Sequence, residues 1–482
     1  MGRTEHFSHL REELHSLLSE HTHRLGQPLD DDTPLISSGV LDSLAVFNLV
    51  VWIEGKLGKT VDPLVTDFAS AWDTVALIIK FIEDSTSPAD RNAITNTNKR
   101  PGAKASELEI VEYSPDFKDM IAQLQTQLWS ANVALNKSYF DWKYEANPYG
   151  TEPQIYLAFY DDSLIGMRGF YPSKWQFGAN REGRIIFVAD DTIVHNEFRS
   201  KGVMNTLMSA AYEGLKERGI GYLFNLSGGD FTVKSSLASG WQSVGSLRPI
   251  LRMSPSERRR NQLRHAMAQT PLLWRYAESE WLSGATRGNP FAYLDRQPNT
   301  MVSQAGVTVS VSRHARPGQM ARLVGQIGDS NRIRHVRDET YLAWRFKNPL
   351  REYRFLYVGE SALDGFMVIQ CERGRGSSRA RVNIVDLEAV NEQVQDALLE
   401  TILRPGLLME VFAWSVTLPI RVRDALSRAG FKLYQPNEAV AGPTIIVRST
   451  DDFQQSADLI VDGLRIVDIR NWDMRMIYSM AG

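Results

Sequence analysis

The sequence predicts a multidomain chain in which a small all-α unit precedes two copies of an α+β unit. Three observations support this: apolar residues at helical spacing in the first 84 residues, an abrupt change of composition after them, and a motif that returns 202 residues later. The length of 482 residues agrees with this prediction, because a single hydrophobic core rarely serves more than about 300 residues.

Residues 1–84 are predicted to form the helical unit. Its apolar residues recur every three or four positions, as at Leu10, Leu14, Leu17 and Leu18, then at Val46, Leu49, Val50, Ile53 and Leu57, and again over 72–82. The unit holds 14 acidic and 6 basic residues, a net charge of −8; since the whole chain carries −3, the remainder carries +5. Residues 85–108 are almost free of apolar side chains and rich in Ser, Thr, Asn, Pro and Gly, which predicts a flexible linker.

An internal repeat divides the rest of the chain. "YFDWKYEANP" (Tyr139–Pro148) returns as "YLAWRFKNPL" (Tyr341–Leu350), and each copy leads into a strand, a turn, a second strand and later a helix that ends in Gly-aromatic. A shared order of elements indicates a duplicated α+β unit. We expect the copies at 109–254 and 307–482, joined by a basic helical connector at 255–306.

Composition excludes several classes of function. A net charge of −3 argues against nucleic-acid binding and polybasic membrane attachment. Cys371 is the single cysteine, so internal disulfides and cysteine-based zinc sites are excluded, and no metal site is expected. The sequence shows no run long enough to span a membrane and no signal peptide at its start, so we expect a cytoplasmic protein.

The stretch "SSGVLDSLAVFNLVVWIE" (37–54) places Ser43 directly before an apolar helix. Ser43 could simply cap that helix. A phosphodiester on Ser43 would also be favoured there by the helix N-terminus. The run Leu35–Leu44 resembles the acyl or peptidyl carrier protein signature, and the resemblance extends over about residues 5–84. It implies a four-helix bundle whose Ser43 carries 4′-phosphopantetheine, attached by a phosphopantetheinyl transferase.

A second informative stretch begins at an apolar strand over 185–188. A turn with Arg199, Lys201 and Gly202 follows and opens an amphipathic helix at Val203. A strand, a cationic Gly turn and a helix start can together bind a pyrophosphate through backbone N–H groups. Basic turns before helices are common, so the pattern alone also fits a solvated turn.

The run "RSKGVM" (199–204) resembles the acyl-CoA loop of the GCN5-related N-acetyltransferase (GNAT) superfamily, as do Asp191-Thr192, His195 and the later Gly240-Trp241. The resemblance covers about residues 110–250 and implies an α+β fold with a mixed sheet whose central strands splay into a V. It implies a CoA or pantetheine site formed by Val194, Arg199, Ser200, Lys201, Gly202 and Val203. Met204 departs from the small residue common in the family.

Direct acyl transfer needs a base, an oxyanion donor and an acid. The candidate bases are Asp190, Asp191 and His195, although the two carboxylates could be ordinary strand-end residues and His195 a turn residue. The family's usual acid is a Tyr at the position held here by Ser236, whose hydroxyl could only hydrogen-bond the departing sulfur. Asn225 and Ser227 could orient substrate or begin the next helix.

The second copy has no Arg-x-x-Gly turn, so we expect it to be degenerate and its Asp386 and Glu388 to be structural. The leading hypothesis is an acyltransferase that moves an acyl or aminoacyl group between a pantetheine thioester and a small-molecule amine in a secondary-metabolite pathway. The thioester would be carried by the chain's own arm or by CoA, so acyl-CoA or CoA is a possible cofactor. An adenylating or acyl-loading enzyme would act in trans. The alternatives are acyl-CoA-dependent loading of Ser43's arm, with or without decarboxylation, and a non-catalytic carrier platform.

Overall fold

The fold is described by a computed structural model. The described residues are 3–19, 29–35, 49, 52–53, 56–57, 72–85, 108–150, 152–198, 202–228, 232–233, 236–237, 240–268, 290–327, 331–373, 380–404, 408, 410–433, 443–450 and 459–480. Among the helices of this part, none combines the length and the apolar character needed to cross a membrane.

In the N-terminal unit the structure describes two helices, α1 (Arg3–Ser19) and α4 (Val75–Ser85). Their apolar faces meet in one buried cluster that includes Leu10, Leu14 and Ile78. The helical spacing of these residues, read from the sequence, is the reason that they share one face of each helix. Of the second expected helix, residues 49, 52–53 and 56–57 are described as helical, and Leu49 and Ile53 join the same cluster. The rest of the expected four-helix bundle, together with Ser43 and almost all of the expected linker, lies outside the described residues.

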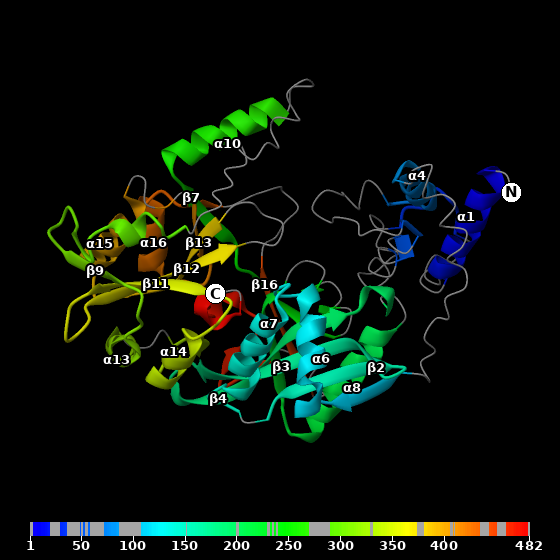
Figure 1. The fold of residues 1–482 in the computed structure, drawn as a ribbon, viewed down its shortest axis with the longest axis horizontal. Helices are drawn as coiled ribbons and strands as arrows, with labels where there is room; N and C mark the ends of the chain where they lie inside the picture. Colours follow the sequence, from blue (N-terminus) through cyan, green and yellow to red (C-terminus); the bar gives the residue numbers. More distant parts are fainter. Residues whose placement is uncertain are drawn as a thin grey trace.

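After the N-terminal unit, the described residues form two eight-stranded sheets with their covering helices, and one two-stranded sheet (Figure 1). The first runs in the order β1 (Glu109–Glu112), β2 (Gln154–Tyr160), β3 (Ser163–Phe177), β4 (Asn180–Val194), β5 (Tyr222–Gly228), β16 (Thr444–Ser449) and β6 (Gln242–Ser246), with β10 (Arg334–His335) beside β3. The second runs in the order β15 (Lys432–Leu433), β7 (Pro249–Met253), β14 (Glu410–Trp414), β13 (Ala380–Ala389), β12 (Gly365–Arg373), β11 (Glu352–Val358), β9 (Thr308–Ser312) and β8 (Thr300–Val302). Both mix parallel and antiparallel pairs, as expected.

Helices cover both faces of each sheet. On the first sheet, α8 (Val203–Glu217) packs against one face, while α6 (Lys118–Leu124) and α7 (Val133–Phe140) pack against the other. On the second sheet, α15 (Glu392–Leu403) and α16 (Ile420–Arg428) cover one face. The opposite face meets α13 (Pro317–Ile327) and α14 (Glu339–Arg345). In the chain, α10 (Pro255–Ala268) comes after β7 and before β8.

The two sheets exchange strands. β7, from the range expected for the first copy, pairs with β14 and β15 in the second sheet. β16, from the range expected for the second copy, lies between β5 and β6 in the first sheet. The expected division at residue 254 therefore does not separate the sheets, and β8 lies within the range expected for the connector. Local patterns locate strands but not their partners, which is why the sequence could not show this exchange.

The repeated motif forms the contact between the copies. The Trp142 and Trp344 rings stack with their centroids 4.7 Å apart. Each indole Nε1 donates to the backbone carbonyl of the other tryptophan, at 2.8 Å in both directions. Equivalent residues thus meet symmetrically, and a single apolar core extends from the first sheet into the second.

One residue distinguishes the two motifs. The first has an additional residue, Ala146, and here the chain forms a π-helical turn, η6 (Asp141–Glu145). A π-turn accommodates one inserted residue within a helix and is frequent at functional sites. It places Trp142, Lys143 and Tyr144 together in the core.

The C-terminal segment, red in Figure 1, lies between the two sheets. It contains the short hairpin of β17 (Ile460–Val461) and β18 (Leu464–Arg465), followed by two 3₁₀ turns. Trp472 packs on Phe224 with ring centroids 5.0 Å apart. The backbone carbonyl of Ile477 accepts from the Tyr341 hydroxyl. This segment therefore joins the first sheet to the second motif.

Candidate active site

The central strands of the first sheet splay apart. β4 and β5 are parallel and pair only at Phe187–Leu223 and Val188–Phe224. The other edge of β5 pairs with β16 over the whole strand, from Tyr222 to Gly228. A cavity of about 140 Å³ occupies the space beside the diverging ends, and it is lined by Leu128, Arg168, Tyr171, Val188, Ala189, Asp190, Thr192, Asn225, Leu226, Ser227, Gly228, Thr232, Ser479 and Met480. The expected V is present, and three of the predicted residues (Asp190, Asn225 and Ser227) line the cavity.

A β-bulge in β4 separates the two candidate carboxylates. Asp190 is opposite Gly169 and Ile193 is opposite Met167, so two residues of β4 face the single residue Arg168. Asp191, the first bulged residue, has a φ of 49°, a left-handed conformation that Asp tolerates better than most residues. The bulge directs Asp191 into the core, with no exposed side-chain surface, while the Asp190 side chain retains 27% exposure.

Asp191 is held by several hydrogen-bond donors. The Trp129 indole donates to Oδ1 at 2.7 Å, and the Tyr144 hydroxyl donates to Oδ2 at 2.7 Å. The amide of Gln125 donates to Oδ2 at 3.3 Å. A buried carboxylate requires hydrogen-bond donors of this kind to offset its loss of hydration. Asp191 therefore anchors the 3₁₀ turn after α6, the following Trp129 and the π-turn to the bulge, and it does not line the cavity.

Lys143 joins the two carboxylates. Its Nζ lies 2.7 Å from Asp190 Oδ2 and 3.0 Å from Asp191 Oδ2. Four aromatic rings surround the ammonium at 5.1 to 5.5 Å from their centroids, and they belong to Trp129, Tyr139, Tyr144 and Tyr171. Aromatic faces favour a cation. The π-turn thus supplies one buried positive charge to two carboxylates.

The pKa values follow from this geometry. Burial raises the pKa of Asp191 above its ordinary value, although the ammonium of Lys143 acts in the opposite direction. Burial alone would lower the pKa of Lys143, but Asp190 and Asp191 outweigh it and the pKa is raised. Burial also raises the pKa of Tyr144. Lys143 is therefore a fixed cation and not a proton acceptor near neutral pH.

Arg168 reaches the same cavity from β3. Its side chain is only 2% exposed. Its Nε is buried without a hydrogen-bond partner. The guanidinium carbon lies 5.2 Å from the centroid of the Phe170 ring.

The turn between β4 and α8 spans residues 195–202. Gly202 has a φ of 77° and is the N-cap of α8, with no side chain to occupy the first N–H groups of the helix. This geometry fits the phosphate cradle expected from the sequence. Val194 and Val203 contribute buried side chains to the apolar cluster beneath α8. Arg199, Ser200 and Lys201 lie outside the described residues.

Besides Asp191, two further predicted catalytic residues, His195 and Ser236, do not line the cavity. His195 follows the end of β4, and its ring lies 6.3 Å from that of Phe198. Its Nδ1 is buried without a hydrogen-bond partner. Ser236 is half-buried, and its backbone carbonyl accepts from the Trp241 N–H at 3.1 Å. The structure brings Asp190, Asn225 and Ser227 together and leaves His195 and Ser236 outside this group.

The second copy differs at the equivalent turn. Only residues 390–391 separate β13 from α15, and the Asn391 side chain accepts from the Val394 N–H. The side chain of Asn391 therefore caps the start of α15, and no loop comparable to 195–202 precedes this helix. This agrees with the degenerate turn expected from the sequence.

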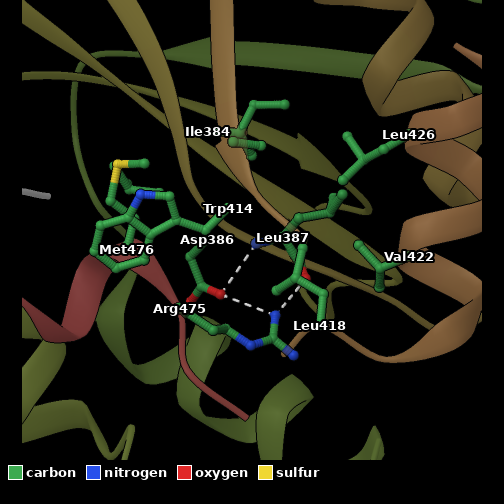
Figure 2. Close-up of a pocket in the computed structure, with 11 residues that line it drawn as sticks. Ile384, Asp386, Leu387, Trp414, Leu418, Val422, Leu426, Arg475 and Met476 are labelled. Carbon is green, nitrogen blue, oxygen red and sulfur yellow. Dashed lines mark hydrogen bonds and ion pairs between the residues drawn. The ribbon is translucent and has the colours of Figure 1, made fainter. Parts of the chain in front are cut away.

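An ion network fills the splay of the second sheet. Arg337 donates to both Asp386 and Glu388. Arg475, from the C-terminal segment, donates to Asp386 and to the Leu387 carbonyl, as Figure 2 shows. The cavity that remains has a volume of about 20 Å³. Asp386 and Glu388 thus have the structural role expected of them.

The sequence analysis did not identify Lys143, Tyr144, Trp129 or Arg168 as site residues. Lys143 and Tyr144 lie inside the repeated motif. The lysine between aromatic residues of that motif was the one sequence feature that could have pointed to them. Trp129 and Arg168 had no local signal, because they reach Asp191 and the cavity only through the folded sheet.

Comparisons with known proteins agree with the arrangement. Residues 12–82 match the family model described as a phosphopantetheine attachment site, and residues 119–230 match the acetyltransferase (GNAT) family. No curated protein matches the chain in sequence.

Similar solved structures include a GCN5-related N-acetyltransferase from Anabaena variabilis, which is 11% identical, with 71% of this chain and 73% of that chain covered at a TM-score of 0.45. A probable N-acyltransferase from Enterococcus faecalis is 10% identical, with 73% and 74% covered at a TM-score of 0.45. A tandem GNAT protein from the clavulanic acid biosynthesis pathway is 12% identical, with 72% and 99% covered at a TM-score of 0.42.

The two matched segments agree with both resemblances found in the sequence. The first lies within the acidic N-terminal unit, and the second contains the splayed strands, the carboxylates and the turn before α8. The chain therefore joins a phosphopantetheine-attachment domain to a GNAT acetyltransferase domain, and it is an acyltransferase.

Proposed function

We propose that the chain transfers an acyl or aminoacyl group from a pantetheine thioester to a small-molecule amine, in the cavity between β4 and β5. The observation that carries this proposal is Asp190. It is the carboxylate of the β4 pair that lines the cavity, and its side chain remains partly exposed. The other carboxylate, Asp191, is enclosed by its donors.

The phosphopantetheine arm, or CoA, supplies the acyl group as a thioester. The amine nitrogen attacks the thioester carbonyl, so a C–N bond forms while the C–S bond breaks. Asp190 accepts the proton that the amine loses. Asn225 and Ser227 line the same cavity and supply an amide and a hydroxyl for orienting the substrate.

The departing sulfur does not require an acid from the protein. A thiol has a pKa of about 8.5, so a thiolate can leave and then take a proton from water. The position of Ser236 outside the cavity is therefore compatible with transfer.

Two features support a thioester attached to pantetheine as donor. The open N-terminus of α8 at Gly202 offers N–H groups to a pyrophosphate or phosphodiester. The attachment domain at 12–82 implies a covalent phosphopantetheine in the same chain, for which we propose Ser43. The opposite net charges, −8 for residues 1–84 and +5 for the remainder, favour their encounter at moderate salt.

We further propose that a phosphopantetheinyl transferase attaches the arm and that an adenylating or acyl-loading enzyme charges it in trans, within a biosynthetic pathway. In this proposal the second copy supports the first through the shared core and binds no CoA. Its ion network and its capped helix start support that role.

Single-turnover chemistry tests the direction of transfer. The holo protein, acylated on its arm, is mixed with candidate amines, and intact-protein mass spectrometry follows the arm while the product is analysed for an amide. We expect loss of the acyl group and formation of the amide. If acyl-CoA alone charges the arm and no amine discharges it, the protein is a loading enzyme and the proposal is wrong.

A further inference from the structure

Arg168 places a positive charge at the cavity, and no carboxylate of the described residues forms an ion pair with it. Its guanidinium stays protonated at any physiological pH, even though burial lowers the pKa of Arg168. No described residue accepts a hydrogen bond from it, and its one recorded partner is the face of the Phe170 ring. Burying an unpaired charge is costly, so the cavity favours a ligand that accepts hydrogen bonds, an acceptor that the described residues do not provide.

Other buried arginines of the described residues show the usual arrangement. Arg337 donates to Asp386 and Glu388. Arg345 donates to the carbonyls of Ile477 and Ser479. The same holds for Arg354 and Arg475, which donate to Asp295 and to Asp386, respectively. Among these buried guanidiniums Arg168 is the one that lines the cavity at β4 and β5.

The carboxylates near Arg168 are already engaged. Asp191 is enclosed by the indole of Trp129 and the hydroxyl of Tyr144. Asp190 accepts from Lys143 at 2.7 Å. The two carboxylates and Lys143 together carry a net charge of −1. Arg168 balances this charge, but it forms no ion pair with either carboxylate. The cavity thus has an acidic side and a basic side.

We propose that Arg168 binds a carboxylate of the small substrate that occupies this cavity. The guanidinium fork matches a carboxylate through two parallel N–H···O bonds. A volume of about 140 Å³ admits a small group. This inference rests on the proposed function, because it takes the cavity to be the place of acyl transfer.

The carboxylate can come from either reactant. On the acceptor it would make the amine an amino acid, whose amino group would approach Asp190 while its carboxylate meets Arg168. On the donor it would be the far end of a dicarboxylic acyl group. Both sources present the same chemistry to Arg168, and the experiment separates them.

Isothermal titration calorimetry on the full-length holo protein compares matched probes. The acceptor arm uses glycine and methylamine, which differ by the carboxylate. The donor arm uses succinyl-CoA and butyryl-CoA, which have acyl chains of equal length. We expect a preference for the carboxylate probe in one arm, and the arm that shows it identifies the source.

Variants assign that preference to Arg168. Arg168→Gln should weaken binding of the preferred probe by about 30-fold or more, as expected when one partner of a buried, hydrogen-bonded charge pair is removed. Arg168→Lys keeps the charge without the fork and should show a smaller loss. Arg448→Gln is the matched control. Arg448 also has buried nitrogens without partners and stacks at 4.0 Å on Tyr212, but it does not line the cavity.

The melting temperature of Arg168→Gln distinguishes a binding role of Arg168 from a structural one. Removing an uncompensated buried charge should leave the melting temperature of Arg168→Gln equal to or above that of the wild type. A structural Arg168 would instead make this variant less stable.

The proposal is overturned if the wild type prefers the carboxylate probe in neither arm, or if Arg168→Gln keeps the preference. These measurements need no turnover. A protein that transfers acyl groups without the preference refutes the inference alone, whereas a protein that shows the preference but transfers nothing refutes the proposed function alone.

Discussion

Two adjacent carboxylates acquire different roles through one bulged residue. A regular strand would place Asp190 and Asp191 on opposite faces of the sheet. The bulge turns Asp191 into the core, and Lys143 then contacts both side chains. Because Asp190 alone of the two retains exposure, it is the residue for which we propose the acid–base role, while Asp191 holds the neighbouring segments to the strand.

Amide substitutions should separate these roles. Asp190→Asn removes the proton acceptor, so the rate of the acyl-transfer step should fall by about 10² to 10⁴-fold. Its loss of stability should be smaller than that of Asp191→Asn, because Asp190 is partly exposed and Lys143 keeps Asp191 as a partner. Asp191→Asn places an NH₂ group where a buried oxygen accepts from Trp129 or from Tyr144, so it should chiefly lower the free energy of unfolding, by about 1 to 3 kcal/mol. Single-turnover rates and denaturant unfolding measure the two effects. Equal losses of rate in the two variants at unchanged stability would contradict the assignment.

His335 predicts how stability depends on pH. Its ring is buried, with Nδ1 donating to the Val336 carbonyl and the ring centroid 4.0 Å from that of Tyr341. Burial lowers its pKa from 6.5 to about 3, and the positive charges of Arg337 and Arg345 act in the same direction. Between these pH values the unfolded chain binds a proton that the folded chain does not, so stability falls as the pH falls.

The size of this effect follows from the linkage relation. Between pH 6.5 and pH 4.5 His335 should contribute a loss of about 2 to 3 kcal/mol in the free energy of unfolding. His335→Gln cannot titrate, so its stability should decline less over the same range. Denaturant titrations at several pH values provide the comparison, and parallel pH profiles for the two proteins would refute the prediction.

At the scale of elements, the turn before α8 distinguishes the two copies. The first copy has eight residues and a glycine N-cap, and the second has two residues and a side-chain cap. The lengths of these turns follow from insertions that the sequence displays directly. The helix that keeps an open N-terminus is therefore the one able to receive an anion.

Gly202→Asp should block acyl transfer. A carboxylate at this N-cap would occupy the N–H groups and repel phosphate, and we expect a loss of at least about 30-fold, or ~2 kcal/mol, in kcat/KM. Combining it with Arg199→Ala should deepen the loss. Steady-state assays with an acyl-CoA, together with melting temperatures, provide the test.

The other end of the same helix provides a matched control. Gly219 has a φ of 71° and open space around it, much as Gly202 does. Gly219→Asp should cost similar backbone strain, about 1 kcal/mol, without affecting transfer. If both variants lost activity equally, strain and not the anion site would explain the result.

On the scale of the whole molecule, the two copies are bound into one body. Each sheet contains a strand from the other copy's range, and the paired Trp142 and Trp344 stack within one continuous core. The C-terminal segment adds contacts to both sheets. The phosphopantetheine-attachment domain has its own apolar cluster, so changes there should not disturb the body.

Ser43→Ala tests that independence together with the site of attachment. Incubation with CoA and a phosphopantetheinyl transferase should add one phosphopantetheine to the wild type and none to the variant, as measured by intact-protein mass spectrometry. The thermal transition of the body should be unchanged, because the substitution lies in a separate unit. A mass gain that persists in Ser43→Ala would place the arm on another residue.

The sequence by itself determined the order of the units, the duplication, the Gly202 turn with its helix, and the pair Asp190 and Asp191. Each of these features lies in one contiguous segment. There, hydrophobic periodicity, glycine and charged residues indicate the local structure within a few residues. The tertiary structure alone decided which carboxylate faces the cavity, and it added Lys143 and Arg168 to the site. Lys143 lies 47 residues from Asp190, and Trp129 lies 62 residues from Asp191. Such contacts, like the exchange of β7 and β16, arise when the sheets assemble, because strand pairing joins segments whose partners no local pattern specifies.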